Sequence, residues 1–132
     1  MQNGVKNRES KENYLKAILI LGGKLSEVRS VDVAKKLGVS KPSVSIAVKK
    51  LCSERLVEFG ETHNLVLTKE GLEYATSIIE RHMVLERFLT DVLEVDVETA
   101  HDDSCRLEHV VSAEVLNKLK ESLPKSPVST SK

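Results

Sequence analysis

Residues 30–51 constrain the fold more than any other stretch of the chain. After Ser30, a typical N-cap, apolar residues recur at helical spacing until Gly38, which permits a tight turn. Ser40 is a typical N-cap for a second helix, and Pro42 is tolerated in its first turn. These features predict a helix-turn-helix. The inner faces of its two helices are predicted to consist of Val33, Leu37, Val44, Ala47, Val48 and Leu51.

The outer face of the second predicted helix carries mostly small hydroxyl groups and cations, on Lys41, Ser43, Ser45, Ile46 and Lys49. Side chains of this kind can contact phosphates and base edges in the major groove of DNA. The local excess of basic residues favours this interpretation. A helical hairpin without a role in DNA binding is the alternative.

A β-hairpin is predicted directly after the helix-turn-helix. Residues 56–59 and 64–67 are short β-prone runs, and residues 60–63 form the expected turn between them. A hairpin in this position is the wing of a winged helix. His63 at its tip is a candidate contact to the DNA backbone, and a solvent-facing loop histidine is the alternative.

Charge is distributed unevenly, although the net charge of the 132 residues is zero. Residues 1–60 contain 12 Lys and Arg against 6 Asp and Glu, whereas residues 61–132 contain 8 against 14. A basic first part suits a polyanion, and an acidic second part suits a cation. Aromatic residues make up only 3% of the chain, so stacking on single strands is disfavoured and duplex DNA is the expected nucleic acid.

Residues 101–109, His-Asp-Asp-Ser-Cys-Arg-Leu-Glu-His, form the second informative pattern. On a helix, at about 100° per residue, four potential metal ligands share an arc of about 100°: His101, Cys105, Glu108 and His109. Earlier in the chain, His82 and Glu86 stand at i, i+4 and also share a helix face. Thiolate, imidazole and carboxylate groups together suit a divalent transition metal, and a solvated polar face is the alternative.

The cellular compartment is predicted from what the sequence lacks. Cys52 and Cys105 provide no disulfide framework, and no apolar run approaches the roughly 18 residues of a membrane span. The polar start of the chain does not resemble a signal peptide. We therefore expect a cytoplasmic protein with no membrane partner.

The other helices are predicted from their caps and their apolar periodicity. The first starts at Ser10 and ends at Gly22-Gly23, and later helices follow Thr68, Asp96 and Ser112. The apolar positions after Thr68 continue from Leu72 to Val92, too far for one small domain to cover. A partner surface is therefore implied.

The chain resembles the DtxR/MntR family of iron- and manganese-dependent transcriptional repressors over about residues 8–122. The most specific parts of the resemblance are Arg81-His82 with Glu86 and the run at 101–109, which is very similar to that of iron-responsive members. The Leu-Thr-Lys-Glu-Gly at 67–71 is shared with many other winged helices and adds little. The resemblance implies a homodimer that represses metal-uptake genes by binding double-stranded operator DNA.

The resemblance also implies roles for individual residues. The primary metal site would consist of Cys105, Glu108 and His109. The ancillary metal site would consist of His82, Glu86 and His101. The DNA-contacting part of the recognition helix would include Ser40, Pro42, Ser43 and Ser45. In the implied mechanism, metal held between the first helix and residues 105–109 sets two recognition helices about 34 Å apart for successive major grooves.

Two departures from the family pattern lie on the first helix. Asn13, a neutral oxygen ligand, stands where iron-type members have Met and manganese-type members have Asp. Lys16 stands where manganese-type members have Glu, which argues against their two-metal arrangement. The chain also ends before the SH3-like third domain of larger members, so we expect no ligands from such a domain.

We therefore predict a mainly α fold, with a winged helix-turn-helix DNA-binding domain and a helical metal-binding and dimerisation domain. The predicted boundaries are 1–70 for the first domain, 71–123 for the second and 124–132 for a flexible tail. The predicted function is a metal-activated repressor with no catalytic residues.

The choice of metal depends on Cys105 and Asn13. The thiolate favours Fe²⁺ over Mn²⁺ and outweighs the neutral amide, while Zn²⁺ or Co²⁺ is expected to bind in vitro. Two other functions stay open. One is a metal-independent winged-helix regulator, and the other is a cysteine enzyme that uses Cys105 with His109 as its base.

Overall fold

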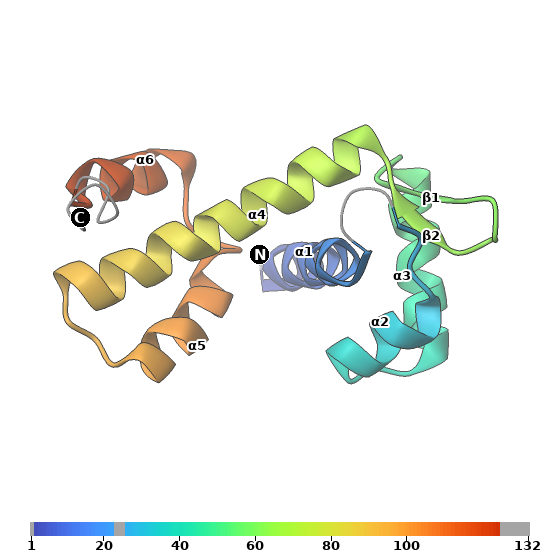
Figure 1. Ribbon diagram of the computed structural model, residues 1–132, viewed down its shortest axis with the longest axis horizontal. Coiled ribbons are helices and arrows are strands. Elements are labelled where there is room, and N and C mark those ends of the chain that lie inside the picture. The colour runs from blue at the N-terminus through green and yellow to red at the C-terminus, as the bar shows by residue number, and fades with distance from the viewer. Residues whose placement is uncertain (1, 23–25, 125–132) are drawn as a thin grey trace. The chain divides into compact units, whose positions relative to one another are not determined.

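The computed structural model describes residues 2–22 and 26–124, and the chain is mainly helical, as predicted (Figure 1). It divides into two units, Met1–Ile79 and Glu80–Lys132, and helix α4 (Lys69–Arg87) belongs to both. The predicted domain boundary at residue 70 lies at the start of α4 and stays a prediction. Apart from Pro124, the predicted tail at 124–132 lies outside the described residues.

Helix α1 (Gln2–Gly22) packs in the first unit against α2 (Ser30–Leu37), α3 (Lys41–Ser53) and strand β2 (Leu65–Leu67). It begins at Gln2, so the predicted start at Ser10 is wrong. No proline interrupts residues 2–9, and a serine that could cap a helix can equally lie inside one. The apolar core between these elements includes Tyr14, Leu15, Ile18, Val33, Val44, Val48, Leu51, Leu65, Ala75 and Ile78.

Helices α2 and α3 form the predicted helix-turn-helix. Gly38 joins them with a φ of 67°, a left-handed conformation that glycine adopts without steric cost. The Ser40 hydroxyl accepts a hydrogen bond from the Ser43 amide at 3.2 Å, which confirms the predicted cap. Ser30 is the first residue of α2 and not its cap, because the carbonyl of Arg29 already accepts from the amides of residues 32 and 33.

The predicted wing is confirmed as an antiparallel hairpin of β1 (Val57–Phe59) and β2, with Val57 opposite Leu67. Val28 pairs with Leu65 on the other side of β2, through hydrogen bonds of 2.7 and 2.8 Å. At the end of the hairpin, the Thr68 hydroxyl accepts from the Gly71 amide at 3.0 Å and so caps α4, as predicted.

The second unit contains the end of α4, the π-helical turn η1 (Phe88–Val92), α5 (Val97–Leu107) and α6 (Ala113–Ser122). Asp96 caps α5 and Ser112 caps α6, as predicted. Helix α5 ends at Leu107, so the prediction that residues 101–109 lie on one regular helix is wrong at its end. The His109 amide bonds to the Arg106 carbonyl, three residues back, because the last turn tightens.

Among the described residues, no helix is both long enough and apolar enough to cross a membrane.

Candidate metal centre and nucleic-acid interface

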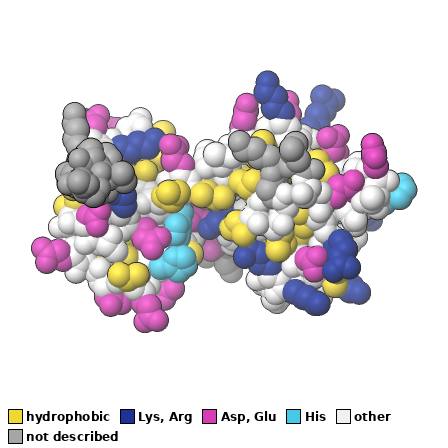
Figure 2. Space-filling view, viewed as in Figure 1, with side chains coloured by type: hydrophobic (Ala, Val, Ile, Leu, Met, Phe, Trp, Pro, Cys, Tyr) yellow, Lys and Arg dark blue, Asp and Glu magenta, His cyan; other side chains and the backbone are white. Residues whose placement is uncertain are grey.

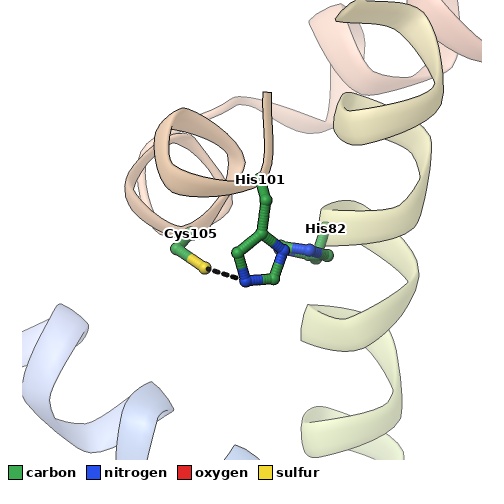
Figure 3. Close-up of side chains that lie close together, drawn as sticks. All are labelled: His82, His101 and Cys105. Carbon is green, nitrogen blue, oxygen red and sulfur yellow. Dashed lines mark hydrogen bonds between the residues drawn. The ribbon is translucent and has the colours of Figure 1, made fainter. Parts of the chain in front are cut away.

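Helices α4 and α5 each carry a pair of potential metal ligands one turn apart, and Figure 3 shows three of these four residues. His82 and Glu86 lie on α4, and His101 and Cys105 lie on α5. Residues four apart share one face of a helix, so each pair points in one direction. The two pairs meet within the second unit, where the imidazole of His101 lies between His82 and Cys105.

One ligand atom from each of His82, His101 and Cys105 lies within 4.8 Å of the other two. The two imidazole rings meet edge to face, with centroids 5.0 Å apart and an interplanar angle of 74°. The Cys105 Sγ lies 3.7 Å from His101 Nε2. Two imidazoles and a sulfur are therefore held close enough together to share one ion.

The ring of His82 is oriented by two carboxylates. Its Nε2 lies 2.8 Å from Glu86 Oε1, and its Nδ1 lies 2.9 Å from Glu108 Oε1. Glu86 Oε1 also lies 3.6 Å from His101 Nδ1. Since both nitrogens of His82 face carboxylate oxygens, rotation of the ring would break at least one strong contact.

Glu108 and His109 lie in the tight turn after α5 and are buried, with exposed fractions of 0% and 1%. His109 Nε2 lies 3.3 Å from Glu108 Oε2, so Glu108 has an imidazole near each of its oxygens. Burial of a carboxylate is costly unless it is paired. The buried Glu108 carboxylate and the two imidazoles beside it are therefore potential ligands in surroundings that favour binding of a cation.

This donor set fits a divalent transition metal. Thiolate and imidazole suit iron, zinc and cobalt, while carboxylate oxygens suit manganese as well. The residues that could hold such an ion are His82, Glu86, His101, Cys105, Glu108 and His109.

The outer face of α3 in the first unit is exposed to solvent, and Lys and Arg side chains gather over α2 and α3 (Figure 2). Exposed basic residues there are Lys35, Lys36, Lys41, Lys49 and Lys50. Pro42, Ser43 and Ser45 are exposed beside them. Ile46 is 71% exposed, and such an apolar side chain can contact a thymine methyl group. Cations, hydroxyl groups and a methyl-bearing surface are the groups that read duplex DNA.

The wing presents His63 at its tip. The residue is exposed and has a φ of 64°, in the left-handed region that few residues other than glycine adopt. This conformation turns the chain back toward β2.

Two family models match the chain, one over most of the first unit and the other over most of the second unit and the start of α4. Residues 7–64 match the family described as iron dependent repressor, N-terminal DNA binding domain, and residues 68–127 match iron dependent repressor, metal binding and dimerisation domain. The transcriptional regulator MntR of Escherichia coli O6:H1 is 39% identical over 110 residues, which are 83% of this chain and 70% of that protein. The chain belongs to the iron dependent repressor family.

Two other similar proteins are longer than this chain. The diphtheria toxin repressor of Corynebacterium glutamicum is 34% identical over 115 residues, which are 87% of this chain and 50% of that protein. A solved structure of the manganese regulator SloR superimposes with a TM-score of 0.73 at 35% identity, covering 84% of this chain and 52% of that one. The chain therefore spans about half the length of these two relatives.

The two ligand sets implied by the family pattern meet at His82 in this structure. Glu86 of the ancillary set and Glu108 of the primary set contact its two nitrogens, while Cys105 of the primary set lies beside His101. The division into two sites stays a prediction. So does the role of Asn13, which is half-buried on α1 in the first unit.

Sequence reasoning missed two acidic residues of the first unit. The Glu12 side chain is 1% exposed, and its carboxylate accepts a hydrogen bond from the Tyr74 hydroxyl at 2.6 Å. Its position three residues before Leu15, at the edge of the apolar stripe, was the available signal. Glu27 bonds to Thr62, 35 residues away, and no local pattern indicates such a contact.

We expect Co²⁺ bound to this protein to show thiolate-to-metal charge-transfer absorption, because Cys105 lies among the imidazoles. A Cys105→Ser variant should bind Co²⁺ without this band. Cys52 is the matched control, since burial and the nearby Glu58 raise the pKa of its thiol, and a protonated thiol is a poor ligand. A band that persists in Cys105→Ser and disappears in Cys52→Ser would contradict the proposed centre.

Proposed function

We propose that this chain is a metal-activated transcriptional repressor that binds double-stranded operator DNA as a homodimer and controls genes of metal-ion homeostasis. The proposal rests on one observation: ligand atoms of His82, His101 and Cys105 lie within 4.8 Å of one another in the second unit. Helix α4, which carries His82, begins in the first unit, directly after the winged helix. Membership of the iron dependent repressor family supports the proposal.

The proposed ligands are Cys105, Glu108 and His109 for the primary site and His82, Glu86 and His101 for the ancillary site, with Asn13 as a further candidate. A bound divalent cation would supply positive charge to a cluster that contains two carboxylates. The carboxylates of Glu86 and Glu108 orient the ring of His82 through its two nitrogens. A ligand changes a conformational equilibrium only by binding one state better than the other, so metal must favour the state that binds DNA.

We propose Fe²⁺ as the preferred metal, with Mn²⁺ able to replace it. The sulfur of Cys105 beside two imidazoles is softer than a set of oxygens and imidazoles alone, which favours iron. The names of relatives include both an iron dependent repressor and a manganese regulator, and so support either ion. Zn²⁺ and Co²⁺ are expected to bind in vitro.

The proposed contacts to DNA are Ser40, Lys41, Pro42, Ser43, Ser45 and Lys49, with His63 on the wing. All seven side chains are exposed in the first unit. Lysines would contact phosphates, and Ser43 and Ser45 would discriminate among bases.

The proposed homodimer would use the second unit, where large apolar side chains are exposed to solvent. Exposed apolar side chains on a small helical unit would be covered by a second copy in the proposed homodimer. The exposed residues are Met83, Val92, Leu93, Val97, Leu107, Val110 and Val115.

Two other functions are less well supported. If the protein were a metal-independent regulator, the burial of Glu108 among imidazoles beside Cys105 would serve no metal binding and would be unexplained. The cysteine enzyme considered from the sequence would use His109 as its base, but the imidazole 3.7 Å from the Cys105 sulfur belongs to His101. A second imidazole, that of His82, lies within 4.8 Å as well, and this donor set suits a metal ion. We propose that the protein is not an enzyme, which membership of the iron dependent repressor family supports, and that it acts in the cytoplasm.

The test of this proposal is operator binding in chelator, in Mn²⁺ and in anaerobic Fe²⁺, with an operator selected from random duplexes by the metal-loaded protein. We expect binding in metal to be at least about tenfold tighter than in chelator. Cys105→Ala should lose most of this difference and still form dimers, whereas Cys52→Ala should retain it. Equal affinity with chelator and with metal would instead establish a metal-independent regulator.

Lys49 tests the placement of the recognition helix. Because each phosphate contact releases counterions, Lys49→Ala should weaken binding to all duplexes and reduce the salt slope of log affinity by about one unit. Lys118→Ala removes the same charge from the second unit and serves as the control. An unchanged salt slope in Lys49→Ala would show that α3 does not lie along the DNA backbone.

A further inference from the structure

The tip of the wing is a short turn that contains two backbone hydrogen bonds. The amide of Gly60 bonds to the Asn64 carbonyl at 2.8 Å, and the amide of His63 bonds to the Gly60 carbonyl at 3.0 Å. His63 has a φ of 64°, which costs free energy in a residue with a Cβ. A conformation of this kind persists when other contacts determine it.

Glu27, which precedes Val28, the residue bridged to Leu65 of β2, supplies such contacts. Its carboxylate accepts hydrogen bonds from the amide of Thr62 at 3.2 Å and from the amide of Asn64 at 3.2 Å, on either side of His63. The Thr62 hydroxyl also donates to this carboxylate. Backbone amides of one turn that converge on the same anion bind it strongly and in a defined direction.

Gly60 makes room for this contact. A Cβ at Gly60 would lie 2.4 Å from the carboxyl carbon of Glu27, closer than real Cβ contacts allow. The backbone next to Glu27 is also fixed in place, because Val28 exchanges two hydrogen bonds with Leu65 and is buried. Glu27 therefore reaches from the paired edge of the sheet to the tip of the wing.

The carboxylate carries its charge at neutral pH, because hydrogen bonds, chiefly from the Thr62 hydroxyl, lower the pKa of Glu27. A negative charge beside a surface that meets DNA repels the phosphates. Electrostatics alone therefore predicts that removal of Glu27 strengthens DNA binding.

We propose that Glu27 is a positioning residue for DNA recognition, which holds residues 61–64 of the wing in the conformation that meets the DNA. The inference rests on the proposed function. It assigns to Glu27 a favourable effect on DNA binding that is opposite in sign to the effect of its charge.

The test compares Glu27→Ala with Glu61→Ala in the full chain loaded with Mn²⁺. Glu61 is an exposed acidic residue of the turn that Glu27 contacts, so both variants remove one negative charge at the tip of the wing. We expect Glu27→Ala to weaken operator binding by about three- to tenfold, and Glu61→Ala to leave it unchanged or slightly tighter. Glu27→Gln, which keeps one acceptor oxygen, should fall between Glu27→Ala and the parent.

A second measurement separates positioning from a general loss of structure. Amide hydrogen exchange at Thr62 and Asn64 should accelerate in Glu27→Ala, while exchange in α1 and α3 and the affinity for Mn²⁺ should match the parent. Operator binding in Glu27→Ala as tight as in the parent, or weakened binding without faster exchange at the wing, would overturn the inference. A parent that binds no operator in metal would instead overturn the proposed function.

Discussion

The second unit depends on one buried carboxylate. Glu108 is fully buried, and such a group is tolerated only when donors or positive charge surround it. His82 Nδ1 lies at hydrogen-bond distance from one of its oxygens, 2.9 Å, and His109 Nε2 lies 3.3 Å from the other. Because His82 comes from α4 while Glu108 and His109 follow α5, this carboxylate fixes how the two helices pack. The same requirement for positive charge explains why a cation is the expected ligand.

Helix α4 gives the two units a common element. In the first unit its Tyr74 hydroxyl bonds to the buried carboxylate of Glu12 at 2.6 Å, next to Asn13 on α1. In the second unit, about two turns further along the helix, it carries His82 and Glu86. Both units thus use α4 to satisfy a buried acidic group. Residues of α4 thus belong both to the core of the first unit and to the cluster around His82.

Much of this arrangement could be predicted from local signals. Gly38, Ser40 and Thr68 lie where their conformational preferences place them, and the hairpin follows from β-prone runs around a turn. The pairs His82–Glu86 and His101–Cys105 follow from helical spacing. That His101 meets His82 and Glu86 was implied by the family resemblance and not by spacing. The contact of His82 with Glu108, and that of Glu27 with the wing, could not be predicted because they join residues distant in sequence. The start of α1 was missed because a capping residue such as Ser10 signals only where a helix could begin.

The central claim is that metal in the second unit and DNA at the first are coupled, and it is tested most directly by measuring Mn²⁺ affinity with and without operator. Coupling between two sites is reciprocal, so operator must tighten Mn²⁺ binding by the factor by which Mn²⁺ tightens operator binding. We predict a factor of about ten or more for the parent, and a factor near one for Cys105→Ala. A parent whose Mn²⁺ affinity is the same with and without operator would contradict the account.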